Sequence, residues 1–172
     1  MSNPTITPMM LLQDELSKRW NTPLGHISFL TFLIVAIVGL GALGIWVEII
    51  RAFSVSKYET DNILTAIYTY FPAIAAGSVL QMLMDAKSEK QQFLRSFCVL
   101  SGFVVAVLTV PYINGLKSCW AYLFGIIGIF SSVWLWWIAN GCNPSFLDID
   151  PNDSLGANPK SNPAGSTSGF TI

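Results

Sequence analysis

Charged residues are scarce in this chain. Asp, Glu, Lys and Arg make up only 11% of its 172 residues, whereas hydrophobic residues make up 52%. An ordinary globular domain has about 25% charged residues, because its surface must be covered by polar groups. The net charge of −1 provides no basic field for a phosphate backbone, so we expect no direct nucleic-acid binding. The composition is typical of a protein whose surface contacts lipid.

Residues that carry catalysis are also sparse. The chain has one histidine, His26, and three cysteines whose positions match neither a zinc site nor a disulfide framework. It contains no CxxC, HExxH or GxSxG motif and no glycine-rich phosphate loop. We therefore expect no enzymatic activity, no cofactor and no metal site.

The most prominent feature of the sequence is a set of long stretches without charged residues. A helix of about 20 apolar residues crosses the hydrocarbon core of a bilayer, and four stretches reach that length: 27–47, 62–84, 96–116 and 118–147. The sequence predicts an all-α integral membrane protein that contacts the lipid bilayer directly. Its membrane domain, residues 27–140, is expected to contain four transmembrane helices at about 27–50, 62–84, 94–115 and 118–140.

The flanking segments have a different composition. In residues 1–26, Met9, Leu12, Leu16 and Trp20 recur at helical spacing. This predicts a short amphipathic helix, either in the membrane interface or packed on the cytoplasmic surface of the protein. Residues 141–172 are rich in Asn, Pro, Ser and Gly, which predicts a flexible, disordered tail.

Basic residues near the predicted helix ends indicate the orientation. Six lie on the side of the termini and three on the other side: Lys18, Arg19, Lys87, Lys90, Arg95 and Lys160, against Arg51, Lys57 and Lys117. The positive-inside rule then places both termini in the cytoplasm. We expect a multi-pass protein of a bacterial inner membrane.

Small residues suit close helix packing in every predicted span. The glycines expected at packing positions are Gly39, Gly41, Gly44, Gly77, Gly102, Gly125 and Gly128. Four short helices bury little surface, so we also expect a homo-oligomer. Pro72 interrupts the hydrogen bonding of the second span and predicts either a fixed bend or a hinge.

Two charged groups are candidates for function. Glu48 and Arg51 lie one turn apart near the end of the first predicted span, as an ion-coupling site or as an interfacial pair that anchors helix depth. Between the second and third spans lies the longest charged stretch, which is either a solvated hairpin or a docking surface for a cytoplasmic protein. Its candidate docking residues are Asp85, Lys87, Glu89, Lys90 and Arg95.

The architecture resembles the small four-span membrane subunit of the bacterial antiphage system Kiwa. The resemblance rests on the amphipathic start at 9–20, four predicted spans in a short chain, and the lack of a catalytic set. It implies an oligomeric membrane sensor that works with a separate cytoplasmic effector acting on phage DNA.

Three functions remain open from the sequence. The first is a non-enzymatic membrane subunit that senses or anchors at the membrane and couples to a cytoplasmic partner. The second is an ion channel, a holin-like pore or a small transporter, suggested by Glu48, Pro72 and the glycines of the first span. The third is a membrane protein that confers immunity to a toxin.

Overall fold

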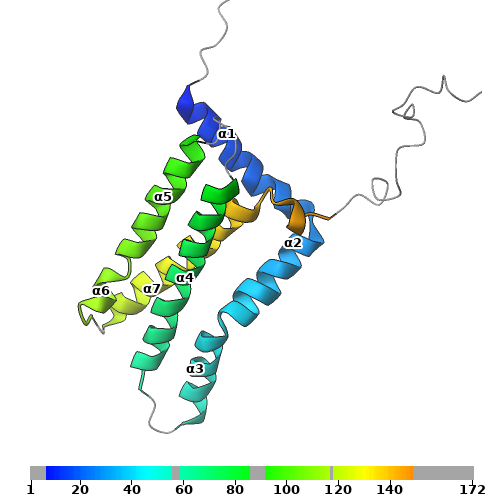
Figure 1. Cartoon of the computed structure of the whole chain (residues 1–172). Helices are drawn as coiled ribbons and strands as arrows, with labels where there is room; N and C mark the ends of the chain where they lie inside the picture. Colours follow the sequence, from blue (N-terminus) through cyan, green and yellow to red (C-terminus); the bar gives the residue numbers. More distant parts are fainter. Residues whose placement is uncertain (1–6, 56–58, 86–91, 117, 149–172) are drawn as a thin grey trace, which may run out of the picture.

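The structure is a computed structural model that describes residues 7–55, 59–85, 92–116 and 118–148. Every regular element in these ranges is a helix or a helical turn (Figure 1), so the expected all-α fold is confirmed. The elements are α1 (Pro8–Asn21), the 3-10 turn η1 (Thr22–Gly25), α2 (Ile27–Phe32), the π-helix η2 (Leu33–Gly41), α3 (Leu43–Ser54), α4 (Asp61–Asp85), α5 (Gln92–Val107), α6 (Val110–Ile113), α7 (Cys119–Asn140) and the 3-10 turn η4 (Pro144–Phe146).

Three helical segments are long and apolar enough to cross a membrane. They are Asp61–Met84, Phe93–Ile113 and Cys119–Asn140. A fourth span is counted only when Pro8–Gly25 and Ile27–Gly41, which are bent by 91° from each other, are taken together. The fold therefore has three to four helices of membrane-spanning length, compared with four predicted.

The first predicted span, 27–50, is divided in the structure. Helical hydrogen bonding changes to the wider π pattern at Leu33 and stops at Ala42, and α3 then begins at Leu43. By contrast, α4 continues as one helix through Pro72. The first predicted span is therefore interrupted at Ala42, whereas Pro72 does not interrupt α4.

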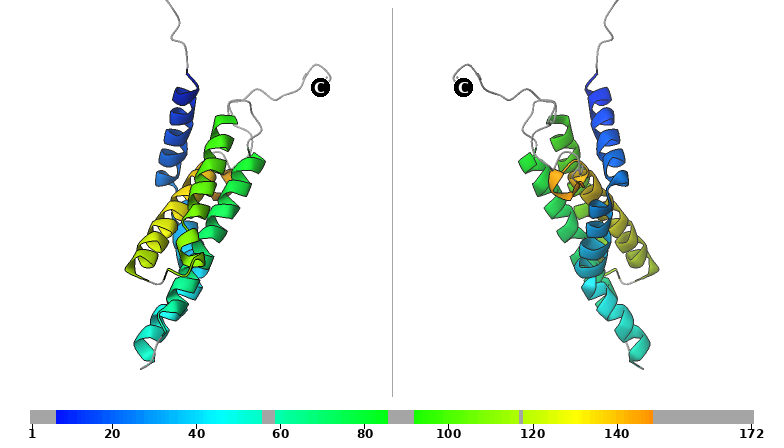
Figure 2. Two further views of the ribbon diagram at one scale, coloured as in Figure 1. Left: turned by 90° about the vertical axis from the view of Figure 1, so that its left-hand side faces the viewer. Right: turned by 90° about the vertical axis from the view of Figure 1, so that its right-hand side faces the viewer.

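The core is built around α4, which packs along α7 and also contacts α5 and α3. Phe71 and Leu135 are fully buried where α4 meets α7. Figure 2 shows α1 at one end of the molecule and α3 at the other. Because α4 contacts all three neighbouring long helices, its apolar faces hold the bundle together.

Glycines permit this close contact at three of the expected packing positions. A Cβ atom at Gly125 would lie 2.7 Å from the Cγ2 of Ile67, and one at Gly128 would lie 2.9 Å from the Phe71 ring. At Gly102 the nearest atom, Cγ2 of Val79, would be only 2.6 Å away. Two other predicted packing glycines, Gly44 and Gly77, have no such atom within 4 Å and face open space.

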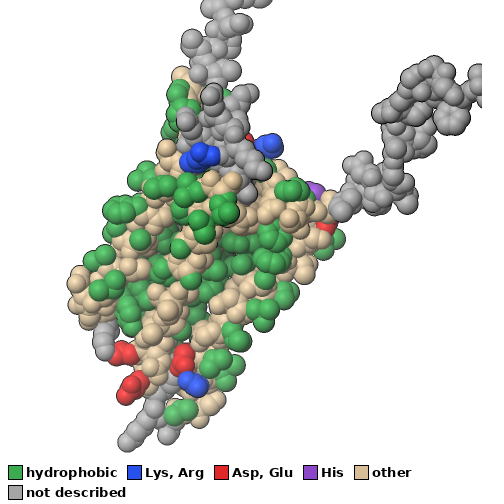
Figure 3. Space-filling model, viewed as in Figure 1, with side chains coloured by type: hydrophobic (Ala, Val, Ile, Leu, Met, Phe, Trp, Pro, Cys, Tyr) green, Lys and Arg blue, Asp and Glu red, His purple; other side chains and the backbone are tan. Residues whose placement is uncertain are grey.

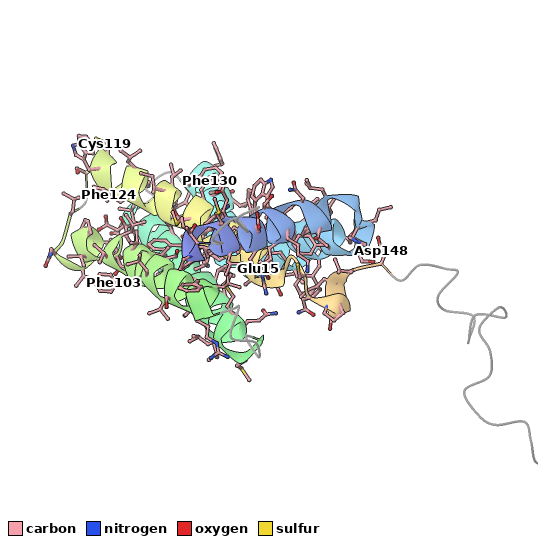
Figure 4. All side chains as sticks on the ribbon, turned by 90° about the horizontal axis from the view of Figure 1, so that it is seen from above. Glu15, Phe103, Cys119, Phe124, Phe130 and Asp148 are labelled. Atoms are coloured by element: carbon pink, nitrogen blue, oxygen red, sulfur yellow. The ribbon has the colours of Figure 1, made fainter. Side chains whose placement is uncertain are left out.

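Large apolar side chains lie on the outside of the bundle. Phe103 is 66% exposed and Phe130 is 72% exposed, and both are labelled on the outer helices in Figure 4. On the face shown in Figure 3, charged side chains gather toward the two ends, with hydrophobic side chains between them. This distribution is that of a surface suited to lipid along its middle and to water at its ends.

Candidate functional site at the junction of α1, α2 and α7

Helix α1 lies across one end of the bundle instead of continuing its direction. It begins with Pro8, and proline is common in the first turn of a helix. The turn η1 then bends the chain by 91° into α2. Seen from above in Figure 4, α1 crosses the bundle, and it contacts both α7 and α5. The helix expected from residue spacing is present, and it packs against α7 and α5.

The apolar residues of α1 fall into two groups, one packed against the bundle and one exposed. Leu12 and Leu16 are partly buried against the bundle core, whereas Met9 is 73% exposed and Trp20 is 45% exposed. Between α1 and α7 lies an apolar groove of about 410 Å³. The groove is lined chiefly by Met9, Leu12, Leu16, Trp20, Trp134 and Ile138.

Arg19 attaches α1 to the end of α7. Its side chain is buried, and its Nη1 donates hydrogen bonds to the carbonyl oxygens of Ile138 and Ala139, each at 3.3 Å. These carbonyls belong to the last turn of α7. The carbonyl groups in the last turn of a helix accept no hydrogen bond from within the helix, and they carry partial negative charge. The Nε of Arg19 also donates to Glu15 at 2.9 Å, so the buried cation is paired.

The end of α1 receives a hydrogen bond in return. The indole nitrogen of Trp137 on α7 donates to the carbonyl oxygen of Trp20 at 3.1 Å, and the two rings lie 5.4 Å apart. At Gly141 the two backbones approach so closely that a Cβ atom would lie 2.0 Å from the carbonyl oxygen of Arg19. The junction therefore requires glycine at this position.

Asp148 fixes the start of α2 from 120 residues farther along the chain. Its carboxylate accepts hydrogen bonds from the backbone N–H groups of Ile27 and Ser28 at 2.7 and 3.1 Å, and its own N–H donates to Nδ1 of His26 at 3.0 Å. We call this arrangement the Asp148 clamp, formed by His26, Ile27, Ser28 and Asp148.

Hydrogen bonding lowers the pKa of the Asp148 carboxyl from its ordinary value. The Ser28 side chain is the largest cause, and the backbone N–H groups of Ser28 and Ile27 and the nearby His26 act in the same direction against partial desolvation. The clamp is therefore suited to an ionised carboxylate.

The first part of the predicted tail is ordered around this clamp. The ring of Phe146 lies 4.5 Å from that of Phe32 and 6.0 Å from that of Trp136. Asn143 accepts a hydrogen bond from the N–H of Ser145 and so caps η4. Residues 149–172, which contain the rest of the predicted disordered tail, lie outside the described part of the chain.

The predicted docking residues are only partly described. Arg95 lies in the first turns of α5, is partly buried, and has an Nε atom without a hydrogen-bond partner among the described residues. Asp85 ends α4, and Lys87, Glu89 and Lys90 lie outside the described residues. The ends of α4 and α5 that flank this segment lie at the same end of the bundle as α1 (Figure 1).

The Glu48–Arg51 pair lies on α3, at the opposite end of the molecule from α1 (Figure 1). Arg51 donates to Glu48 at 2.8 Å, and the Arg51 side chain is 62% exposed. This geometry is that of an ion pair at the end of a helix, one turn apart as the sequence predicted. In the described part of the chain, neither Pro72 nor the Asp148 clamp lies next to this pair.

The side chains at the junction connect helix ends to one another. Most of their hydrogen bonds are to backbone N–H or carbonyl groups. Within the described ranges, no group of three or more His, Cys, Asp and Glu residues could hold a metal ion. Sequence reasoning missed the roles of Arg19, Trp137, Gly141 and Asp148. Of the residues at this junction, only His26 stood out in the sequence, because it is the single histidine and precedes a predicted helix.

No protein-family model matches this chain, and comparisons with curated proteins and with solved structures give no match.

We predict that Gly141→Ala loosens α1 from α7. The added methyl group would meet the Arg19 backbone, and overpacking of this kind costs about 1 to 3 kcal/mol. Tryptic cleavage after the exposed Lys18, followed by mass spectrometry, should become at least about 5-fold faster. Gly25→Ala is the matched control, because its Cβ atom would have no neighbour within 4 Å. Equal cleavage rates in the two variants would contradict the proposed close approach.

We also predict that the Asp148 clamp opens only in acid. Because the pKa of Asp148 is lower in the folded state than its ordinary value of 3.8, its stabilisation is present above 3.8 and is lost as the pH falls through the lowered value. The amide proton shifts of Ile27 and Ser28, followed by NMR, should titrate with a midpoint below 3.8. A midpoint at or above the ordinary value would show that the carboxylate does not accept these bonds.

Proposed function

We propose that this chain is a non-enzymatic, multi-pass subunit of a bacterial inner membrane, homo-oligomeric and with both termini in the cytoplasm. Its function would be to sense or anchor at the membrane and to couple to a cytoplasmic protein. The observation that carries the proposal is the gathering of α1, the Asp148 clamp and the adjoining ends of α4 and α5 at one end of an apolar bundle (Figure 1).

Membrane insertion is supported by length and by surface composition. Three to four helices reach spanning length, and side chains as large as Phe103 and Phe130 are mostly exposed on the outside of the bundle. Exposing such residues to water along a whole bundle would favour aggregation, whereas exposing them to lipid costs nothing.

Coupling to a partner is supported by the construction of α1. It contacts the bundle through Arg19, Trp137 and a few apolar residues, and it leaves Met9 and Met10 exposed. A helix held in a defined position, with large apolar side chains exposed at its start, offers a partner a preformed contact surface. The charged segment 85–95 runs from the end of α4 to α5, which contacts this helix, and would supply the polar part of a docking surface.

The resemblance to the Kiwa membrane subunit extends the proposal to antiphage defence. In that reading the partner is a separate effector protein, and this chain itself does not contact DNA. The net charge of −1 is compatible with such a division of roles.

Partner capture from native membranes tests the proposal. The full chain, purified in mild detergent, should bring down a cytoplasmic protein in fixed ratio, and Lys87→Glu with Lys90→Glu should reduce its yield at least about 5-fold. Lys57→Glu with Lys117→Glu changes the net charge equally on the opposite predicted side and should leave the yield unchanged.

A chain ending at residue 150 retains the Asp148 clamp and separates the tail from the junction. Loss of the partner in this variant alone would place the contact in the tail. A homo-oligomer without partner in all variants would contradict the proposal, and ion flux in liposomes that changes in Glu48→Gln would favour the pore alternative.

A further inference from the structure

The interruption at Ala42 leaves backbone groups without helical partners in the middle of an apolar segment. Residues Leu33–Gly41 form a π-helix, Ala42 has φ −87° and ψ 14°, and α3 starts at Leu43. In an apolar environment such groups must be satisfied within the protein. The hydrogen bonds made at this break therefore determine how its two halves are held.

Two side chains supply hydrogen bonds at the break. The hydroxyl of Tyr70 on α4 donates to the carbonyl oxygen of Ile37 at 3.0 Å, and the indole nitrogen of Trp46 on α3 donates to that of Val38 at 2.8 Å. Tyr70 thus holds η2 to α4, whereas Trp46 crosses the break and holds α3 to η2. The two bonds have separate mechanical roles.

Two glycines lie in the last turns before the break. A Cβ atom at Gly39 would lie 3.3 Å from the carbonyl oxygen of Ile34, and one at Gly41 would lie 3.1 Å from that of Ala36. Both oxygens belong to the same π-helix, so larger residues would press on its own turns. From the sequence, both glycines were expected to contact a neighbouring helix. Only at Gly41 would a Cβ atom meet one, at 3.4 Å from Cε2 of Tyr70 on α4.

Helix α3 is lightly packed and has space beside it. It contains no buried residue, and Phe53 is 89% exposed. A groove of about 310 Å³ lies beside its contacts with α4, and a Cβ atom at Gly44 would have no neighbour within 4 Å. The groove is lined mainly by Gly41, Gly44, Ile45, Ala66, Tyr70 and Ala73.

We propose that Ala42 is a hinge about which α3 moves against α4, and that the Trp46–Val38 hydrogen bond is the lock that holds the position seen here. A hinge requires interrupted backbone bonding, weak packing on the moving side and free space, and all three meet at this break. π-Helical turns also occur often at functional sites. The Glu48–Arg51 pair moves with α3. This device stands apart from the cytoplasmic coupling proposed above and does not depend on it.

Distances between spin labels test the hinge in lipid nanodiscs. The label positions are exposed: Phe53→Cys on α3, Phe130→Cys on α7 and Ile34→Cys on η2. The background is the full chain with Cys98→Ala, Cys119→Ser and Cys142→Ser. Trp46→Phe removes the lock but keeps an aromatic ring. Trp120→Phe is the matched control, because the Trp120 indole lies on the surface of α7 and donates to no described residue.

The hinge predicts a selective effect. Trp46→Phe should broaden the 53–130 distance distribution or add a second population, with the open fraction rising about 2- to 10-fold, as expected for one neutral hydrogen bond. The 34–130 distance should stay narrow, and Trp120→Phe should change neither. An unchanged 53–130 distribution, or equal broadening of both distances, would overturn the proposal, because α3 would then be fixed or would move together with η2.

Hydrogen exchange provides a second test that does not need labels or Trp46. Tyr70→Phe should raise amide exchange in residues 37–42 about 2- to 10-fold while α7 remains protected. Tyr68→Phe is its control, since it removes a hydroxyl from the same helix that donates instead to Ala121 on α7. Equal exchange of residues 37–42 in the two variants would show that Tyr70 does not hold η2 and would overturn this division of roles.

Discussion

Backbone groups that lack helical partners are the constraint on which this structure depends. A helix end in apolar surroundings cannot rely on water, so another part of the protein must supply the hydrogen bond. Here the donors and acceptors come from distant residues: Arg19 bonds the end of α7, Trp137 bonds the end of α1, and Asp148 accepts from the start of α2. These polar contacts determine the direction of α1, and the apolar contacts along α4 hold the remaining helices together.

The two ends of the bundle are constructed differently. At one end, α1 and the segment 143–148 are fixed by several polar and aromatic contacts around α2 and α7. At the other end, α3 has no buried residue and is joined to η2 across a break in helical bonding. A membrane subunit that couples to a cytoplasmic partner, as we propose, would combine a defined docking end with a movable end on the far side.

The sequence predicted the elements that depend on local composition. Charge-free stretches indicated the long helices, and the spacing of Met9, Leu12, Leu16 and Trp20 indicated α1. The break at Ala42 could not be predicted, because 27–47 is a continuous charge-free stretch and because the hydrogen bonds that Tyr70 and Trp46 donate to η2 depend on the folded arrangement. Asp148 was missed because it lies in a segment of tail-like composition, and Arg19 because a buried arginine and an exposed one look the same in sequence.

The most direct test of the proposed topology uses two native cysteines at opposite ends of α7. Cys119 is exposed at its start, and Cys142 is partly exposed just after its end. In chains that retain one of these cysteines, a membrane-impermeant maleimide applied to intact spheroplasts should label Cys119 and should label Cys142 only after the membrane is permeabilised. Labelling of Cys142 from outside, or of both cysteines from the same side, would contradict the proposed membrane topology.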